Sequence, residues 1–106
     1  MIPKKVRLKV YERDSHDGAA CCIHCGSPSS LSVAHVVNAS QGGLAIEENL
    51  VTMCFECHTK MDNGADGEII RRFAEDYLKG KYEGWDRAKM VDDLDPNWLF
   101  GIRGRD

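Results

Sequence analysis

Hydrophobic positions near the start of the chain fit two periods. Val6, Leu8 and Val10 alternate as in a strand, but Val6 and Val10 also form an i,i+4 pair. Of these two alternatives for "PKKVRLKVYERD", we favour a short helix.

Two apolar runs follow in the middle of the chain. Leu31, Val33 and Val36 or Val37 form a β-favouring run, "NASQGG" is typical of a turn and loop, and "NLVTMC" is a second apolar run. We expect a helix to begin directly after Cys54. The expected order of elements in this part of the chain is therefore strand, loop, strand and helix.

The strongest periodic pattern lies after Asp66, a candidate helix N-cap. Apolar residues recur at i,i+3 and i,i+4 spacing and predict a helix face that packs against the preceding elements. That face comprises Ile69, Ile70, Phe73, Ala74, Tyr77 and Leu78. A shorter helical piece is expected over 85–94, before Pro96, and residues 101–106 should fray.

Composition indicates one small domain over residues 1–106 of the α+β class. A chain of 106 residues with 42% hydrophobic and 29% charged residues has a core small enough to benefit from a structural metal. The basic start "MIPKKVRLKV" has no apolar stretch of signal-peptide type, and the longest apolar run, 19–23, is too short for a membrane span. We therefore predict a cytoplasmic chain with reduced thiols and no membrane association.

Four of the five cysteines form two C-x-x-C pairs, Cys22 with Cys25 and Cys54 with Cys57. Two such turns supply the four thiolates that structural Zn²⁺ prefers. The second pair also reads C-x-x-C-H with His58, the pattern of c-type haem attachment, but that reading ignores the first pair and normally requires export. We predict a four-cysteine zinc site.

Two residues near the first pair are left out of this site. Cys21 could replace Cys22 with C-x3-C spacing, but matching turns are simpler, and a spare cysteine is most often a small buried apolar residue. His24 lies inside the turn and is expected to be exposed rather than a ligand.

With the four paired cysteines assigned to zinc, His58 and His35 are the candidates for chemistry. The run of His35, Gly42-Gly43, Asn49-Leu50 and Cys54-x-x-Cys57-His58 resembles the HNH, or ββα-metal, endonucleases, in the branch with a four-cysteine zinc. "SQGGLAIEENLVTMCFECH" is especially similar to small HNH proteins of bacteriophages and their hosts. The likeness is close over residues 22–63 and looser over a helical tail, 66–100.

The resemblance implies a ββα-metal finger flanked by N- and C-terminal helices, and an endonuclease or nickase that hydrolyses DNA with Mg²⁺ or Mn²⁺. It also suggests a place in a bacterial or phage-infected cell, with terminase or other packaging proteins as partners. A partner protein or a homodimer would add to the DNA affinity of a single chain.

Phosphodiester hydrolysis needs a base for the attacking water and a cation for the developing charge. A neutral imidazole, with a pKa near ~6.5, can accept the proton, and we assign this role to His35. His58 is the candidate ligand of the divalent ion. The family resemblance assigns the same two roles and gives Asn49 the task of bracing the loop beside His35.

One position departs from the family pattern. Many HNH proteins have an acidic residue or histidine before the general base, where it binds the ion, but this chain has Ala34. Asp62, four residues after His58, would share its helix face and could complete the site. It could also orient the His58 ring or be a surface charge, and Asn38 is a weaker alternative ligand.

Charge gives limited support for nucleic-acid binding. The net charge is −3, yet residues 1–13 hold five basic residues against Glu12 alone, and Arg103 and Arg105 lie near the other end. We expect modest DNA affinity through the basic segment 1–13, although a solvated helix face explains it equally well. The alternative function is a non-catalytic zinc ribbon that binds DNA or protein.

Overall fold

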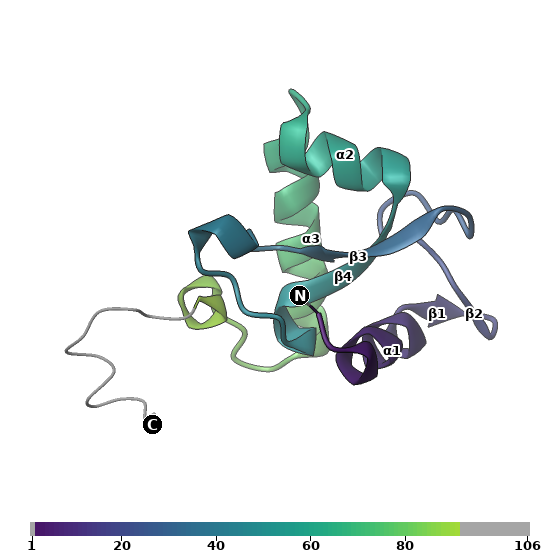
Figure 1. Cartoon of the computed structure of the whole chain (residues 1–106), viewed down its shortest axis with the longest axis horizontal. Helices are drawn as coiled ribbons and strands as arrows, with labels where there is room; N and C mark the ends of the chain where they lie inside the picture. The colour runs from purple at the N-terminus through teal and green to yellow at the C-terminus, as the bar shows by residue number, and fades with distance from the viewer. Residues whose placement is uncertain (1, 92–106) are drawn as a thin grey trace.

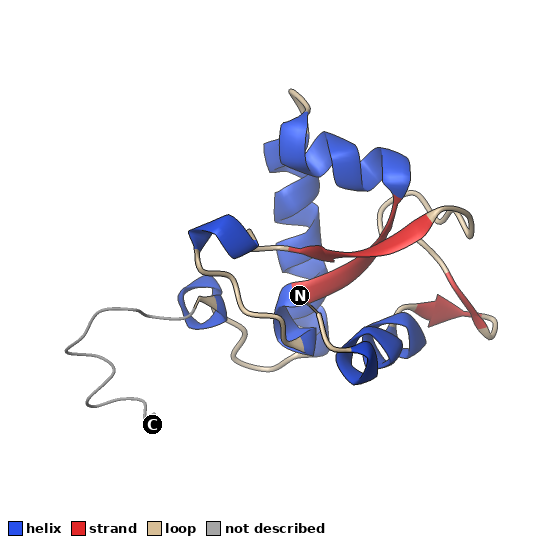
Figure 2. Cartoon of the chain, viewed as in Figure 1, coloured by secondary structure: helices blue, strands red, loops and turns tan. Residues whose placement is uncertain are grey.

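The computed structural model describes residues 2–91 of the chain. Its elements in order are α1 (Lys4–Arg13), β1 (Ser15–His16), β2 (Ala19–Ala20), β3 (Leu31–His35), η1 (Ala39–Gln41), η2 (Glu47–Asn49), β4 (Leu50–Cys54), α2 (Phe55–Asn63), α3 (Gly67–Lys81) and η3 (Arg87–Met90). The η elements are 3-10 helices. The predicted sequence of strand, loop, strand and helix is confirmed as β3, β4 and α2 (Figures 1 and 2).

Strands β3 and β4 form an antiparallel pair whose register places the two candidate sites at opposite ends. Leu31 lies opposite Cys54 at one end, and His35 lies opposite Leu50 at the other. Helix α2 starts at the Cys54 end immediately after the strand. The cysteines therefore gather at one end of the hairpin, and His35 lies at the other.

The two faces of this hairpin are covered by different helices, as Figure 1 shows with α1 below the strands and α2 above them. On one face Val33 and Leu50 pack with Val10 of α1. On the other face Ala34 packs with residues of α2 and α3, such as Met61 and Ala74. This alternation follows from the two-residue period of a strand, and it produces a small α+β fold.

The helical reading of the first segment is confirmed. In α1, Val10 is buried and Val6 is half-buried, whereas Leu8 is exposed. A strand would have placed all three residues on one face. The i,i+4 spacing of Val6 and Val10, and not the alternation of the three residues, therefore indicated the correct secondary structure.

Helix α3 begins where predicted, but its apolar face is only partly covered. Ile70, Ala74 and Leu78 are buried, whereas Ile69 is 67% exposed and Phe73 is 41% exposed. The expectation that all six residues pack into the core is therefore wrong, because α2 covers only a narrow stripe of α3. Asp66 stands at the N-cap position without a capping side-chain hydrogen bond.

The later helical prediction is corrected in part. Residues Arg87–Met90 form a short 3-10 helix, and Val91 bridges to Gly43. Positions 92–106, including the end of the expected tail 66–100, Arg103 and Arg105, lie outside the described residues. Within residues 2–91, no helix is long and apolar enough to span a bilayer.

Candidate active site

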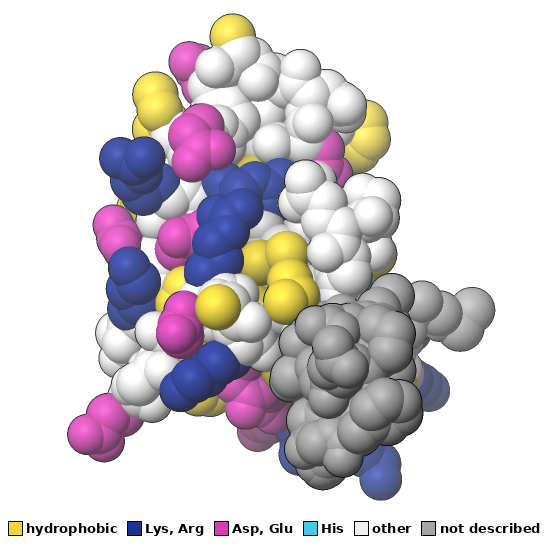
Figure 3. All heavy atoms as spheres, turned by 90° about the vertical axis from the view of Figure 1, so that its left-hand side faces the viewer, with side chains coloured by type: hydrophobic (Ala, Val, Ile, Leu, Met, Phe, Trp, Pro, Cys, Tyr) yellow, Lys and Arg dark blue, Asp and Glu magenta, His cyan; other side chains and the backbone are white. Residues whose placement is uncertain are grey.

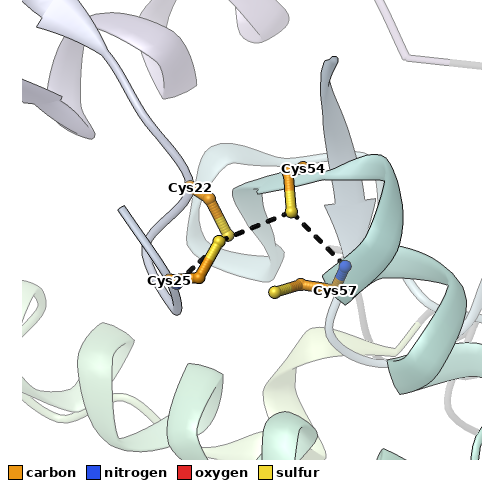
Figure 4. Close-up of side chains that lie close together, drawn as sticks. All are labelled: Cys22, Cys25, Cys54 and Cys57. Atoms are coloured by element: carbon orange, nitrogen blue, oxygen red, sulfur yellow. Dashed lines mark hydrogen bonds between the residues drawn. The ribbon is translucent and has the colours of Figure 1, made fainter. Parts of the chain in front are cut away.

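The four paired cysteines converge from three parts of the chain. Cys22 and Cys25 come from the loop before β3, Cys54 ends β4, and Cys57 lies in the first turn of α2. Their sulfur atoms all lie within 4.8 Å of one another (Figure 4). All but Cys25 are buried.

The spacing and the hydrogen bonds of these sulfurs fit a tetrahedral metal. The Cys25 and Cys54 Sγ atoms are 3.6 Å apart, close to the roughly 3.8 Å edge of a tetrahedron with 2.3 Å Zn–S bonds. In each pair the second backbone N–H donates to the first sulfur, from Cys25 to Cys22 at 3.5 Å and from Cys57 to Cys54 at 3.4 Å. Such donors favour the thiolate form that binds metal.

The pKa values of two of these closely spaced thiols, Cys22 and Cys57, shift in opposite directions. Burial raises the pKa of the Cys57 thiol, and the neighbouring cysteine side chains raise it further. Burial also acts to raise the pKa of Cys22, but backbone N–H groups, led by that of Cys25, outweigh it and lower this pKa to about 7. A divalent cation is the group that would let all four sulfurs ionise together.

The two residues left out of the predicted cluster lie outside it. Cys21 is half-buried, and its Sγ faces the backbone oxygen of Asp14 at 3.7 Å. His24 is exposed, yet its Nδ1 lies 3.4 Å from the Cys57 sulfur and its ring meets Phe73 edge-on. His24 therefore contacts the cluster from outside.

The two candidate catalytic histidines line one open pocket of about 410 Å³. His35 enters it from the end of β3 and His58 from α2, and Asp62 lies one turn beyond His58. The pocket is lined by His35, Asn38, Ala39, Ser40, His58, Asp62 and Asn63. Residues distant in sequence thus present two imidazoles, a carboxylate and amides to one solvent-accessible space.

Both ring nitrogens of His58 have partners. Its Nδ1 lies 2.8 Å from the hydroxyl of Ser32, which itself donates to the Met53 carbonyl, and its Nε2 lies 3.3 Å from Asp62 Oδ2. If the Ser32 hydrogen is used on Met53, Ser32 accepts from Nδ1–H, and the lone pair of His58 is on Nε2. Sequence reasoning missed Ser32, whose position on a strand gave no signal.

That lone pair and Asp62 fit a hard divalent ion. Two neighbouring ligands of an octahedral ion with bonds near 2.1 Å lie about 3.0 Å apart, and the Nε2 to Oδ2 separation is 3.3 Å. Ala34 takes no part, since it is fully buried in the core. Asn38 lines the same pocket and offers a further oxygen.

The surroundings of His35 lower the pKa of its ring. Burial lowers its pKa below the ordinary histidine value, and the neighbouring His58 lowers it further. The neutral imidazole is therefore favoured. Among the residues that the structure describes, none hydrogen-bonds to the His35 ring, which leaves it free to accept a proton.

Asn49 is buried and does not line the pocket. It is fully buried, and its amide makes two bonds to the backbone of Val37, accepting from N–H at 2.9 Å and donating to the carbonyl at 3.2 Å. It also donates to the Leu44 carbonyl at 2.9 Å. Asn49, which directly precedes β4, thus ties together two parts of the loop: Val37, two residues after His35, and Leu44.

Close backbone packing in this loop requires glycine at position 43. A Cβ on Gly43 would collide with the carbonyl group of Val37, and the Gly43 N–H donates to Asn38 at 2.9 Å. The "GG" of the sequence therefore lets the loop turn back against the end of β3.

Arg71 is the second residue that sequence reasoning missed. It occupies a buried position of α3, in line with Gly67, Ala74 and Leu78 at helical spacing, and its guanidinium pairs with Asp62 at 3.4 Å. A charged residue on the core face of a helix was the available signal.

Comparison with known proteins places these features in a family. No curated protein matches the chain. Residues 22–64 match the family model described as HNH endonuclease, and this span contains both cysteine pairs, β3, β4 and α2. The matched segment has the strand, strand, helix order and encloses the four-cysteine cluster, so residues 22–64 of this chain form an HNH endonuclease segment.

Proposed function

We propose that this chain is a metal-dependent endonuclease or nickase that hydrolyses DNA phosphodiester bonds. The observation that carries the proposal is the meeting of His35, His58 and Asp62 in one open pocket within the HNH segment. The non-catalytic zinc ribbon, the alternative, gives no reason for the two histidines to share a pocket.

In this mechanism His35 accepts the proton of the attacking water. The lowered pKa keeps its ring neutral at cellular pH, which a general base requires. Asn49 holds the adjacent backbone through Val37, so that the ring stays directed toward the scissile phosphate. His35 ends β3 and Asn49 directly precedes β4, so the base and the residue that supports it lie at the same end of the strand pair.

His58 and Asp62 would hold the catalytic divalent ion, with Mg²⁺ or Mn²⁺ as the candidates. When bound, the ion supplies Lewis-acid stabilisation of charge on the phosphate and the leaving oxygen. Ser32 keeps the His58 ring in the orientation that offers Nε2. Zn²⁺ in the four-cysteine cluster would serve a structural role.

DNA affinity in this proposal comes from a limited basic surface. Lys4, Lys5, Arg7 and Lys9 are all exposed on α1. The face in Figure 3, by contrast, mixes Lys and Arg with Asp and Glu. Because few phosphate contacts are available, binding should be modest, and a partner such as a packaging protein or a second copy would strengthen it.

The deciding experiment compares plasmid cleavage by the wild-type protein and by His35→Ala with Mg²⁺ or Mn²⁺. Loss of a general base should slow cleavage by about a hundredfold or more, while zinc content and melting stay unchanged. His16→Ala, which alters an exposed histidine in the β1–β2 hairpin, is the matched control. Equal cleavage by His35→Ala and wild type would refute the assignment, and DNA binding without cutting would favour the zinc ribbon.

A further inference from the structure

Arg71 links the two elements that carry the active-site residues. Its Nη1 donates to the carbonyl oxygens of His35, at 3.5 Å, and of Val36, at the end of β3. Its Nη2 reaches the Met61 carbonyl at 3.3 Å and Asp62 Oδ1 at 3.4 Å, both near the end of α2. One guanidinium thus contacts both the base-bearing strand and the ligand-bearing helix.

The same group also reaches the pocket loop. Nη2 lies 3.4 Å from the side-chain oxygen of Asn38. The side chain of Arg71 is only 10% exposed, and both terminal nitrogens are engaged with protein oxygens. Because the terminal nitrogens of Arg71 are occupied by protein oxygens, its effect on catalysis passes through the groups it holds.

We propose that Arg71 is the positioning residue of the active site: it sets the separation of the His35 strand from the Asp62 helix and directs Asp62 toward the ion-binding nitrogen of His58. This inference rests on the proposed function. Arg71 binds Oδ1 of Asp62, which leaves Oδ2 beside His58 Nε2. A planar fork with several donors suits this bridging, whereas a lysine cannot span the same acceptors.

Removal of Arg71 should change metal affinity in opposite directions, depending on whether Arg71 acts through its charge or by positioning Asp62. A fixed cation beside the ligand pair repels a divalent ion, so if Arg71 acted only through charge, its removal would tighten Mn²⁺ binding. If Arg71 positions Asp62 and the strand, its removal should weaken Mn²⁺ binding by about ten- to a hundredfold, as for other residues that orient metal ligands. The sign of the change therefore separates the two.

The experiment measures Mn²⁺ affinity by electron paramagnetic resonance in zinc-loaded wild type, Arg71→Met and Arg71→Lys. Arg72→Met is the matched control, since Arg72 is the next residue on α3, is 74% exposed and has only a 4.0 Å contact with Glu68. We expect Arg71→Met to bind Mn²⁺ more weakly and lose kcat, with KM for DNA changed less than about twofold. Arg71→Lys should be intermediate, and Arg72→Met should match wild type.

Three results would overturn the proposal: Mn²⁺ affinity and kcat unchanged in folded Arg71→Met, Mn²⁺ affinity increased in that variant, or no Mn²⁺ binding by wild type. If Arg71→Met does not fold, Arg71→Lys decides, and wild-type values for it would mean that Arg71 only stabilises the fold. A wild type that binds Mn²⁺ but cuts no DNA would refute the endonuclease function, while the Mn²⁺ affinities would still decide the role of Arg71.

Discussion

At the scale of single residues, the candidate site contains two side chains, His58 and Asp62, that each contact two partners through different atoms. Asp62 divides its two oxygens between His58 and Arg71, and His58 divides its two nitrogens between Asp62 and Ser32. Each side chain is therefore oriented by one contact and leaves the other atom for function. Substitutions here should change metal affinity more than stability.

Titrating cleavage against Mn²⁺ separates three roles of Asp62: a ligand of the ion, a group that orients the His58 ring, and a surface charge whose loss should cost almost nothing. If Asp62 is a ligand, Asp62→Ala should need more Mn²⁺ for cleavage and should recover part of its activity at high Mn²⁺. The zinc content should not change, because thiolates and carboxylates select different ions. As an orienting group, its loss should cost about ten- to a hundredfold in affinity or activity. His58→Ala gives the curve for a lost ligand.

The control for this titration is Asp76→Ala, which removes an exposed carboxylate from α3. It should follow the wild-type curve. Superimposable curves for wild type and Asp62→Ala would remove Asp62 from the ion site and leave Asn38 or solvent as the companions of His58.

The lowered pKa of His35 predicts the acid side of the pH profile. Only the neutral ring accepts a proton, so kcat/KM should fall as pH drops through the pKa of His35, and burial places that midpoint below the ordinary value of about 6.5. A nearby divalent cation would lower it further. The profile should be measured at constant ionic strength.

An independent measurement of the same pKa is histidine NMR titration of the zinc-loaded protein without added Mn²⁺. A His35 midpoint above the ordinary histidine value of about 6.5 would contradict the prediction. It would mean that the charged ring is the favoured form, which is unsuited to a general base.

At the scale of elements, a buried polar network joins α1 to the rest of the fold. Asp14 follows α1 and is buried, and its carboxylate accepts from Arg13, from the Thr52 N–H of β4 at 2.9 Å, and from the Tyr77 hydroxyl of α3 at 2.6 Å. Arg13 also donates to the backbone oxygens of Glu47 and Leu50. Three elements thus meet at one ion pair.

Tyr77→Phe should destabilise the protein by about 1.5–3 kcal/mol, since it removes a hydrogen bond to a buried carboxylate. Burial and the bond to Asp14 raise the pKa of Tyr77, so its hydroxyl remains a donor at neutral pH. For a domain of this size each kcal/mol corresponds to roughly 4–8 °C in Tm. Thermal unfolding followed by circular dichroism measures the shift.

Tyr82→Phe is the matched control for Tyr77→Phe. The Tyr82 hydroxyl donates to Glu47, which is half-buried, whereas the Tyr77 hydroxyl donates to the buried carboxylate of Asp14. Water can replace the contact with Glu47, so the loss of stability should be smaller for Tyr82→Phe. A Tyr77→Phe variant as stable as wild type would show that the network contributes nothing measurable to docking of α1.

At the scale of the whole molecule, the four-cysteine cluster ties the loop before β3 to the junction of β4 and α2. The Cys22 to Cys57 span includes both strands and the pocket loop. With so small a core, metal binding at this point is coupled to folding. The active site therefore depends on a cluster at the other end of the hairpin.

Cys57→Ser should lose zinc and unfold, because three thiolates and a hydroxyl hold the ion poorly. Elemental analysis of wild type should find about one zinc per chain. Cys21→Ser is the matched control, since its thiol lies outside the cluster, and it should keep zinc and melt as wild type does. A folded, metal-free Cys57→Ser with an unchanged melting curve would contradict the structural role of the metal.

Sequence alone was sufficient for the features that depend on local spacing. The C-x-x-C pairs, the β-favouring runs and the helix starts after Cys54 and Asp66 are set by neighbouring residues, and the structure confirms these elements. The hairpin of β1 and β2 around the Asp17–Gly18 turn was not predicted, because its strands are too short for periodicity to reveal them, although both turn residues have positive φ.

Only the tertiary structure decided which side chains meet and which stay exposed. Arg71 reaches the His35 strand, and Ser32 reaches His58, because α2 packs on β3 and α3 on α2. Ile69 and Phe73 remain exposed because α2 covers only part of α3. Periodicity states that a helix has an apolar face, but how much of that face is buried depends on the width and angle of the partner, which no local pattern contains.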